Sequence, residues 1–229
     1  MAEESILHPI AHIRSDFASK FGIPRQSGVV EALTARVVFV PEFRSRDALR
    51  GIEDFSHLWL IWEFSAAKRE GFTPTVRPPR LGGNERMGVF ATRSPFRPNS
   101  LGLSCVRLLR VEETEDEGTV LLVSGTDMMD GTPIYDIKPY LPYTDAHPEA
   151  RGGFAQEHLS DILQVEADDA LMQKVPPEKR EALLALLRQD PRPAYQHDPD
   201  RVYGFPYGEW EVRFTVRDGT LTVTEIEKR

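Results

Sequence analysis

The sequence contains a single cysteine, Cys105, among its 229 residues. One cysteine excludes an intramolecular disulfide and a zinc site built from the cysteines of one chain, and it is typical of a reducing compartment. The chain also lacks a long apolar run. Its opening, MAEESILHPIAHIRSDF, starts with acidic side chains and resembles neither a signal peptide nor a membrane span. We therefore expect a cytoplasmic protein.

Basic charge is in short supply as well. The chain has 28 Lys and Arg against 36 Asp and Glu, which gives a formal net charge of -8 at pH 7. This balance argues against non-specific wrapping of nucleic acid by a basic surface, so any contact with RNA must be local. The sequence also has no G-x-G-x-x-G motif between a predicted strand and a predicted helix. A Rossmann-type cofactor site is therefore not indicated.

The first part of the chain has short apolar segments separated by charged or glycine-containing turns. These segments predict strands at 7–14, 35–40, 56–64, 103–111, 120–124 and 133–137. The segment 56–64 is the longest apolar and aromatic run, and we expect it to be buried on both faces. Many short strands with little helix predict a mostly β fold that begins with a β-barrel or curled sheet.

The character of the sequence changes after Tyr143, where TDAHPEARGGFAQE is polar and is interrupted by proline and a glycine pair. This stretch predicts a boundary between an N-terminal domain of residues 1–145 and a small α+β domain of residues 155–229. The leucines of PPEKREALLALLRQDPRP predict a helix that begins at the prolines and stops before Pro191. The tail alternates on both sides of Asp218-Gly219 and predicts a β-hairpin.

The most unusual stretch is TVRPPRLGGNERMGVFATRSPFRPNSLG, residues 75–102, which contains five arginines and the single acid Glu85. Its prolines and glycines predict a loop in which only 87–93 forms a short strand. The planar fork of arginine suits phosphates and carboxylates. We interpret four of these arginines as RNA contacts, and the alternative is that they only solvate the loop. The four are Arg77, Arg80, Arg86 and Arg97.

In the same stretch, MGVFATRSPFRPNSLG resembles the signature of the TrmO family, also called TsaA-like or YaeB. The segments RPPRLGGNERMG, FSHLWLIW, DGTPIYDIKPYLPY and DPRPAY are similar to other blocks of that family, in the family's order. The resemblance implies an N-terminal β-barrel that binds S-adenosylmethionine, a smaller C-terminal domain and a homodimer. It also implies methylation of N6 in N6-threonylcarbamoyladenosine, next to the anticodon of tRNA.

The resemblance carries the family's cofactor site over block by block. The residues assigned to the methyl donor are Gln26, Ser27, Gly28, Ala67, Lys68, Arg93, Leu103, Gly125, Thr126 and Asp127. Ala67 and Lys68 lie in SAAKREG, which departs from the family pattern, so only backbone contacts carry over there. Arg93 suits the methionine carboxylate of the cofactor, and backbone groups near Thr126 suit the adenine edge.

The acceptor nitrogen of this reaction is bonded to a carbonyl carbon, so its lone pair is delocalised and a proton acceptor is useful. Within TDMMDGTPIYDIKPY, the residues Asp127, Asp130 and Asp136 can accept a proton, and we favour the last two. Lys138 can stabilise anionic charge. Tyr140 can stack on a base or donate a hydrogen bond. Two alternatives stay open. Asp130 is also an ordinary turn residue in D-G-T-P, and proximity alone can supply much of the rate of a methyl transfer.

The block DPRPAY ends the predicted helix and presents Arg192 and Tyr195, which suit an RNA backbone and a base. The alternative is a helix stop that packs on the barrel. In the family we expect this block near the partner subunit's active site. His8 and His12 have no third ligand near them in sequence, so we predict no metal site. Trp59 and Trp62 are interpreted as core residues.

Two other functions remain compatible with the sequence. A non-catalytic tRNA-binding module would explain the arginines and aromatics, but not the carboxylates beside a polyanion. An S-adenosylmethionine-dependent enzyme acting on a small molecule would suit the acidic net charge better than an RNA substrate does. Bound methyl donor excludes the first, and a steep salt dependence of substrate binding excludes the second.

Overall fold

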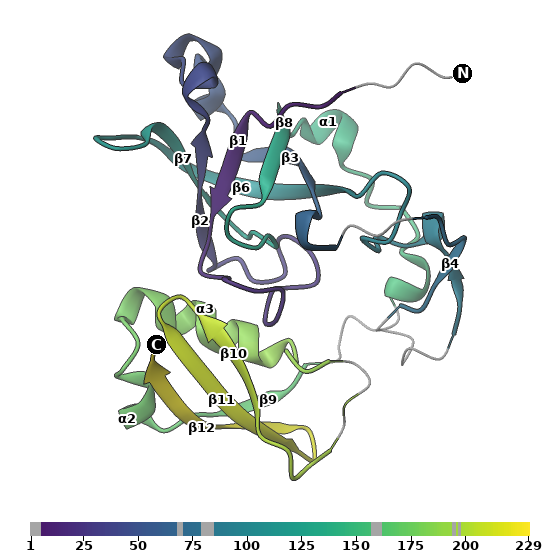
Figure 1. Ribbon diagram of the computed structural model, residues 1–229, viewed down its shortest axis with the longest axis vertical. Helices are drawn as coiled ribbons and strands as arrows, with labels where there is room; N and C mark the ends of the chain where they lie inside the picture. The colour runs from purple at the N-terminus through teal and green to yellow at the C-terminus, as the bar shows by residue number, and fades with distance from the viewer. Residues whose placement is uncertain (1–5, 68–70, 79–84, 157–161, 194–195, 197) are drawn as a thin grey trace.

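The structure is a computed structural model of the chain that describes residues 6–67, 71–78, 85–156, 162–193, 196 and 198–229. It consists of an N-terminal β-barrel and a smaller C-terminal α+β domain, which lie one above the other in Figure 1. The predicted fold class is confirmed. Across the described residues, no helix has the length and apolar character needed to cross a membrane.

The barrel is a closed antiparallel sheet with the strand order β1-β2-β7-β6-β3-β8. Its strands are β1 (Ala11–Arg14), β2 (Thr34–Phe39), β3 (His57–Glu63), β6 (Leu101–Thr114), β7 (Gly118–Ser124) and β8 (Pro133–Pro139). Alternate apolar residues of these strands point inward, and Ile13, Leu60 and Ile134 are fully buried. Each strand lies at or near a predicted segment, because alternation marks the face that must leave water.

Two predictions for the barrel region were wrong. The strand β3 is not buried on both faces. Its buried residues Leu58, Leu60 and Trp62 alternate with partly exposed ones, because the outer face of a barrel is open to solvent. The segment 87–93 is not one strand either: only β5 (Met87–Gly88) pairs, with β4 (Thr75–Val76). Val89–Ala91 then forms a short 3-10 helix, in which Val89 alone is buried.

Short helical turns connect the barrel strands. Among the described residues, the 3-10 turns between barrel strands are η1 (Pro41–Phe43), η2 (Arg46–Leu49), η3 (Ile52–Asp54), η4 (Ser65–Ala67) and η6 (Val89–Ala91), and η7 (Gly153–Ala155) follows the barrel. A single α-helical turn, α1 (Pro142–Asp145), follows β8. The first three turns form the end of the barrel away from β4 in Figure 1.

The C-terminal domain is a four-stranded sheet with the order β10-β11-β12-β9 and two helices. The elements are β9 (Gln164–Glu166), α2 (Asp169–Met172), α3 (Pro177–Arg188), β10 (Tyr203–Tyr207), β11 (Trp210–Arg217) and β12 (Thr220–Lys228). The predicted helix is α3, and its buried face carries Leu183, Leu186 and Leu187. The predicted hairpin is β11–β12. Its turn residues Asp218 and Gly219 have φ of 48° and 79°.

The connection between β1 and β2 belongs to both domains. This segment, residues 15–33, leaves the barrel and returns to it, yet its buried side chains Phe17, Val30 and Leu33 lie in the core cluster of the C-terminal domain. The barrel has a separate core cluster without them. The segment is therefore the part of the N-terminal half that holds the two domains together by apolar packing.

Polar contacts support the same junction. Lys179 on α3 pairs with Asp16 at 2.5 Å, and the amide of Gly208 donates to the Asp16 carbonyl at 2.8 Å. Gly22, with φ of 80°, lies directly against the ring of Phe205 on β10. A glycine is needed there because it combines a left-handed backbone with a contact that leaves no room for a Cβ.

The junction gives a stability prediction. A Cβ on Gly22 would lie 2.3 Å from the Phe205 ring, whereas Gly219, with nearly the same φ, has no atom within 4 Å of that position. We expect Gly219→Ala to lower the free energy of unfolding by about 1–2 kcal/mol, from backbone strain alone. Gly22→Ala should cost about 1–3 kcal/mol more, from overpacking. Chemical denaturation measures both, and equal losses would contradict the proposed junction.

Candidate functional site

The strand β6 has an open edge at its N-terminal half. On one side, β3 pairs with β6 from Leu101 to Arg107. On the other side, pairing with β7 begins only at Arg107, opposite Ser124. Two loops lie beside the open stretch instead of a strand, and the amide of Cys105 donates to the hydroxyl of Ser27 at 3.1 Å. The backbone around Leu103 is thus open to a ligand on this edge, whereas the amides of Leu101 and Cys105 already donate to Asn99 and Ser27.

The two loops at this edge are tied to each other by close backbone contacts. The amide of Gly28 donates to the carbonyl of Gly125 at 2.8 Å. The amide of Gly125 donates to the carbonyl of Leu33, also at 2.8 Å. A Cβ on Gly125 would lie only 3.3 Å from the backbone of Gly28. Arg93 reaches the same place from the arginine-rich stretch, and its Nη1 donates to Gln26 Oε1 at 2.6 Å. Most residues assigned to the methyl donor therefore come together.

Asp127 is the partly buried charge of this cluster. Its carboxylate accepts a hydrogen bond from Ser104 Oγ at 2.5 Å, and Ser104 Oγ accepts one from Trp62 Nε1 at 2.9 Å. Burial raises the pKa of the Asp127 carboxyl, and hydrogen bonds from Ser104 and the backbone of Ser27 oppose that rise, as does the positive charge of Arg93. The pair Ser104 and Trp62 was not predicted to act at the site.

A sequence signal for this pair does exist. Ser104 is a polar residue at an inward position of β6, fully buried beside apolar neighbours, and such a residue needs a specific partner. Gly102 lies on the same face two residues earlier. A Cβ there would lie 2.3 Å from the Trp62 ring, so the indole covers Gly102. The glycine of RPNSLG is therefore required by the tryptophan that anchors Ser104.

Thr126 supplies a further polar group to the cluster. The residue is 1 % exposed, and its Oγ1 has no hydrogen-bond partner among the described residues. A buried hydroxyl without a partner costs free energy, so a group that binds there would recover that cost. The cluster combines an exposed guanidinium, a partly buried carboxylate, this hydroxyl and a free backbone edge. These groups suit a zwitterionic ligand with a planar heterocycle.

The proposed catalytic side chains Asp136, Lys138 and Tyr140 follow one another on β8 and just after it. Lys138 Nζ lies 3.0 Å from Asp136 Oδ2, and both side chains are about half exposed, at 62% and 47%. The ring of Tyr140 contacts that of Trp59 at a centroid distance of 5.8 Å. The indole Nε1 of Trp59 in turn donates to Asp145 Oδ2 at 2.9 Å. Trp59 is therefore only partly a core residue.

Strand register connects this group to the open edge of β6. Leu103 lies opposite Ile61, and Ile61 lies opposite Asp136. Ile61 is an outward position of β3, since its neighbours Leu60 and Trp62 point inward, and its two partners lie in the same outward row. Two strand spacings of about 5 Å each separate Leu103 from Asp136, so the backbone of Leu103 lies roughly 10 Å from that of Asp136. The outer face of β6, β3 and β8 thus joins the two sets of residues.

Asp130 makes different contacts. Its Oδ1 accepts the amide of Ser15 at 3.1 Å, and its Oδ2 lies 3.8 Å from Arg14 Nη1. Its own amide donates to the carbonyl of Phe17 at 2.8 Å, and Gly131 after it has φ of 77°. These contacts favour the turn interpretation of D-G-T-P, in which Asp130 fixes the start of the segment 15–33.

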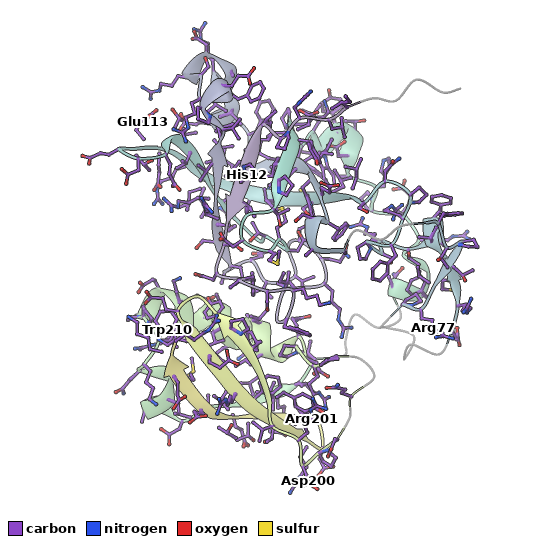
Figure 2. The ribbon with its side chains drawn as sticks, in the orientation of Figure 1. His12, Arg77, Glu113, Asp200, Arg201 and Trp210 are labelled. Atoms are coloured by element: carbon purple, nitrogen blue, oxygen red, sulfur yellow. The ribbon has the colours of Figure 1, made fainter. Side chains whose placement is uncertain are left out.

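Three of the four loop arginines interpreted as RNA contacts lie among the described residues. Arg77 is exposed and lies at the edge of the molecule on the β4 side (Figure 2). Arg86 is also exposed and donates to Thr75 Oγ1 at 3.2 Å, and Arg97 donates to the carbonyl of Thr92 at 3.0 Å. Arg80 lies outside the described residues, as do Lys68 and Tyr195.

Arg192 is held inside the C-terminal domain. Its guanidinium forms two 2.8 Å hydrogen bonds with the carboxylate of Asp190, and its side chain is only 10% exposed. It also lies over the ring of Tyr203, at 5.9 Å from the centroid. This geometry favours a helix stop that packs within the chain over a free RNA contact.

Ala67, which was assigned to the methyl donor, ends η4, where its amide donates to the carbonyl of Phe64 at 3.0 Å.

Comparison with known proteins gives consistent results. Residues 12–146 match the model of the tRNA-methyltransferase O N-terminal domain, and residues 160–229 match that of the TrmO C-terminal domain. The tRNA (adenine(37)-N6)-methyltransferase of Escherichia coli K12 is 40% identical over 96% of this chain and 97% of its own length. A Pseudomonas aeruginosa protein named as an S-adenosylmethionine-dependent methyltransferase is 42% identical over 90% of each chain.

Solved structures agree with the sequence matches. A crystal structure of TrmO from Pseudomonas aeruginosa superimposes with a TM-score of 0.81, at 33% sequence identity, and covers 100% of this chain and 99% of that one. The family models together cover both the barrel, with its open β6 edge, and the C-terminal sheet. The chain therefore belongs to the tRNA-methyltransferase O (TrmO) family.

Proposed function

We propose that this protein is an S-adenosylmethionine-dependent tRNA (adenine(37)-N6)-methyltransferase. The names of its relatives carry that activity and that cofactor. The observation that carries the proposal is the cluster at the open edge of β6, where Arg93 and the partly buried Asp127 lie beside a free strand edge. The finer proposal is that the target adenosine already bears a threonylcarbamoyl group on N6, as the family resemblance implies.

The residues of the cluster fit S-adenosylmethionine. Arg93 matches the carboxylate of its methionine part, and Asp127 matches its positive charge or its ribose hydroxyls. The unpaired Oγ1 of Thr126 and the open backbone beside Leu103 can hydrogen-bond an adenine edge. Gly28, with φ of 77° and no atom within 4 Å of the place a Cβ would occupy, leaves space on the open side. The cofactor supplies an electrophilic methyl group on a sulfonium.

The chain's own part in the chemistry is to orient the acceptor nitrogen and to take its proton. We assign the proton acceptor to Asp136, because strand register puts it within about 10 Å of the Leu103 edge. Lys138 Nζ lies 3.0 Å from Asp136 Oδ2, and it can stabilise negative charge on the threonylcarbamoyl oxygens. Tyr140 is suited to stack on the target base. Asp130 we retain as a residue that shapes the 15–33 segment.

We also propose the roles of the two domains, the RNA contacts and the oligomeric state. Residues 1–145 form the cofactor-binding domain, and residues 155–229 form the second domain. Arg77, Arg86 and Arg97 contact tRNA phosphates. The enzyme acts in the cytoplasm, and it acts as a homodimer. Large, exposed apolar side chains on and near the outer barrel face support the homodimer. Examples are Leu103 at 52% and Tyr143 at 87%.

The test of the proposed function is transfer of labelled methyl from S-adenosylmethionine to tRNA. Total tRNA should be taken in parallel from cells with and without the threonylcarbamoyl modification. We expect label only in the modified pool. Label in neither pool, with cofactor bound, would point to a small-molecule substrate, and absence of cofactor binding would point to a non-catalytic tRNA-binding module. Equal label in both pools would remove the threonylcarbamoyl requirement alone.

Asp127 gives a prediction with opposite effects on stability and binding. Burial raises its pKa in the folded protein, so the folded state binds more protons than the unfolded chain between the two pKa values. Its contribution to stability therefore falls as the pH rises through that window. Asp127→Asn should remove this loss and unfold at an equal or higher denaturant concentration at neutral pH.

The same variant should bind S-adenosylmethionine at least about tenfold more weakly, because a hydrogen bond to a charged group is lost. Its affinity should also no longer rise with pH through the Asp127 pKa. Arg93→Ala serves as the comparison, since it should lose affinity at every pH without a change in stability. Calorimetric titration across pH measures both, and an Asp127→Asn variant with the affinity and pH profile of the unmodified chain would refute the assignment.

A kinetic prediction separates the two aspartates. Asp136→Asn should lower kcat about a hundredfold or more at saturating tRNA, because the proton acceptor is removed. Asp130→Ala should act mainly on the free energy of unfolding, since it removes the contacts to Ser15 and Arg14. Single-turnover methyl transfer together with chemical denaturation measures both changes. A full-rate Asp136→Asn enzyme would leave orientation alone as the source of the rate.

A further inference from the structure

The two-stranded ribbon β4–β5 carries an exposed aromatic pair at one end. Phe72 precedes β4, and Phe90 follows β5; their side chains are 55% and 73% exposed. The two rings stack with a centroid distance of 6.3 Å and an interplanar angle of 24°. Neither ring belongs to either core cluster. Two phenylalanines exposed side by side are unfavourable in water, so the pair indicates a surface that binds a partner.

The other end of the same ribbon is basic. Thr75 lies opposite Gly88 and Val76 opposite Met87, so the antiparallel register brings the next residues, Arg77 and Arg86, to the same end. Both arginines are exposed, and the one acid in the described part of this region is Glu85. In a chain with a formal net charge of -8, this combination of arginine and stacked aromatic side chains is complementary to a polyanion with flat bases.

The ribbon is fixed relative to the cofactor cluster. Phe90 lies in the 3-10 turn Val89–Ala91, and Thr92 closes that turn through hydrogen bonds from its amide and its hydroxyl to the carbonyl of Val89, at 3.2 Å and 2.8 Å. Arg93, which reaches Gln26, is the next residue. A base stacked on Phe90 would therefore be held at a defined place next to the site where we propose the methyl donor binds.

We propose that Phe72 and Phe90 form a stacking platform for unpaired bases of the RNA substrate, and that Arg77 and Arg86 hold the phosphates along the same ribbon. The six residues from Phe72 to Arg77 span at most about 17 Å, which is the length of several stacked nucleotides. The platform selects single-stranded RNA, because bases paired in a duplex do not offer a free face to an aromatic side chain. This proposal rests on the proposed function and extends it to the recognition of the anticodon loop.

The experiment compares leucine substitutions of the pair with a matched control. Phe72→Leu and Phe90→Leu keep an apolar side chain but remove the aromatic face, and each should weaken binding of a tRNA anticodon stem-loop roughly tenfold. Binding of S-adenosylmethionine should not change. The control is Phe43→Leu, since Phe43 is 37% exposed on η1, at the far end of the barrel from β4 in Figure 1. It should bind RNA like the unmodified chain.

A gain-of-signal variant tests stacking directly. Phe90→Trp should keep the RNA affinity, and its additional tryptophan fluorescence should be quenched when a single-stranded oligoribonucleotide binds. A duplex of the same sequence should quench it much less. Unchanged fluorescence together with normal binding would overturn the platform. The same conclusion follows if Phe90→Leu binds the stem-loop as tightly as the unmodified chain, or if the leucine variants change the molecular mass in light scattering.

These outcomes distinguish the platform from the proposed function. If the unmodified chain methylates tRNA and the leucine variants bind and methylate it equally well, the platform is wrong and the methyltransferase stands. If the chain binds the stem-loop through Phe72 and Phe90 but transfers no methyl group, the platform stands and the methyltransferase is wrong. If the chain binds neither tRNA nor the stem-loop, both proposals fail.

Discussion

The site depends above all on apolar packing of the segment 15–33 into the C-terminal domain. Phe17, Val30 and Leu33 lie in the C-terminal core, while the loop between them carries Gln26 to Gly28 to the open edge of β6. A loop of this length between two barrel strands would otherwise be mobile. The C-terminal core thus holds the loop that carries Gln26 to Gly28 in place, and both domains contribute to the proposed cofactor site.

The other half of the site is held by a chain of buried polar contacts. Trp62 covers Gly102 and donates to Ser104, which donates to Asp127. A carboxylate that loses part of its hydration on folding lowers stability, and proteins keep such groups where binding needs a charge that water screens only weakly. The carboxylate of Asp127 lies against Ser27, and so the barrel interior and the segment 15–33 meet at one acid. Packing and electrostatics therefore serve the same place.

The outer face of the barrel gives the site its reach toward RNA. Leu103, Ile61 and Asp136 share one row across three strands, and the arginine-rich stretch leads from the β4–β5 ribbon to Arg93. Because strand spacing is fixed by hydrogen bonding, the distance between the cofactor edge and the proposed proton acceptor is set by the sheet and not by a flexible loop. Local charge on the ribbon then allows an acidic protein to bind a polyanion.

The sequence by itself determined the barrel strands, helix α3 and the β11–β12 hairpin, because alternation, leucine spacing and Asp218-Gly219 act locally. Its blocks also determined the family. Only the tertiary structure decided which residues meet. Asp130 contacts the start of the segment 15–33, whereas Asp136 lies on the outer face of the barrel. Arg192 is held by Asp190. Ser104 connects Trp62 to Asp127 through hydrogen bonds. Periodicity encodes which face of an element leaves water, whereas loop contacts arise only once distant segments pack together.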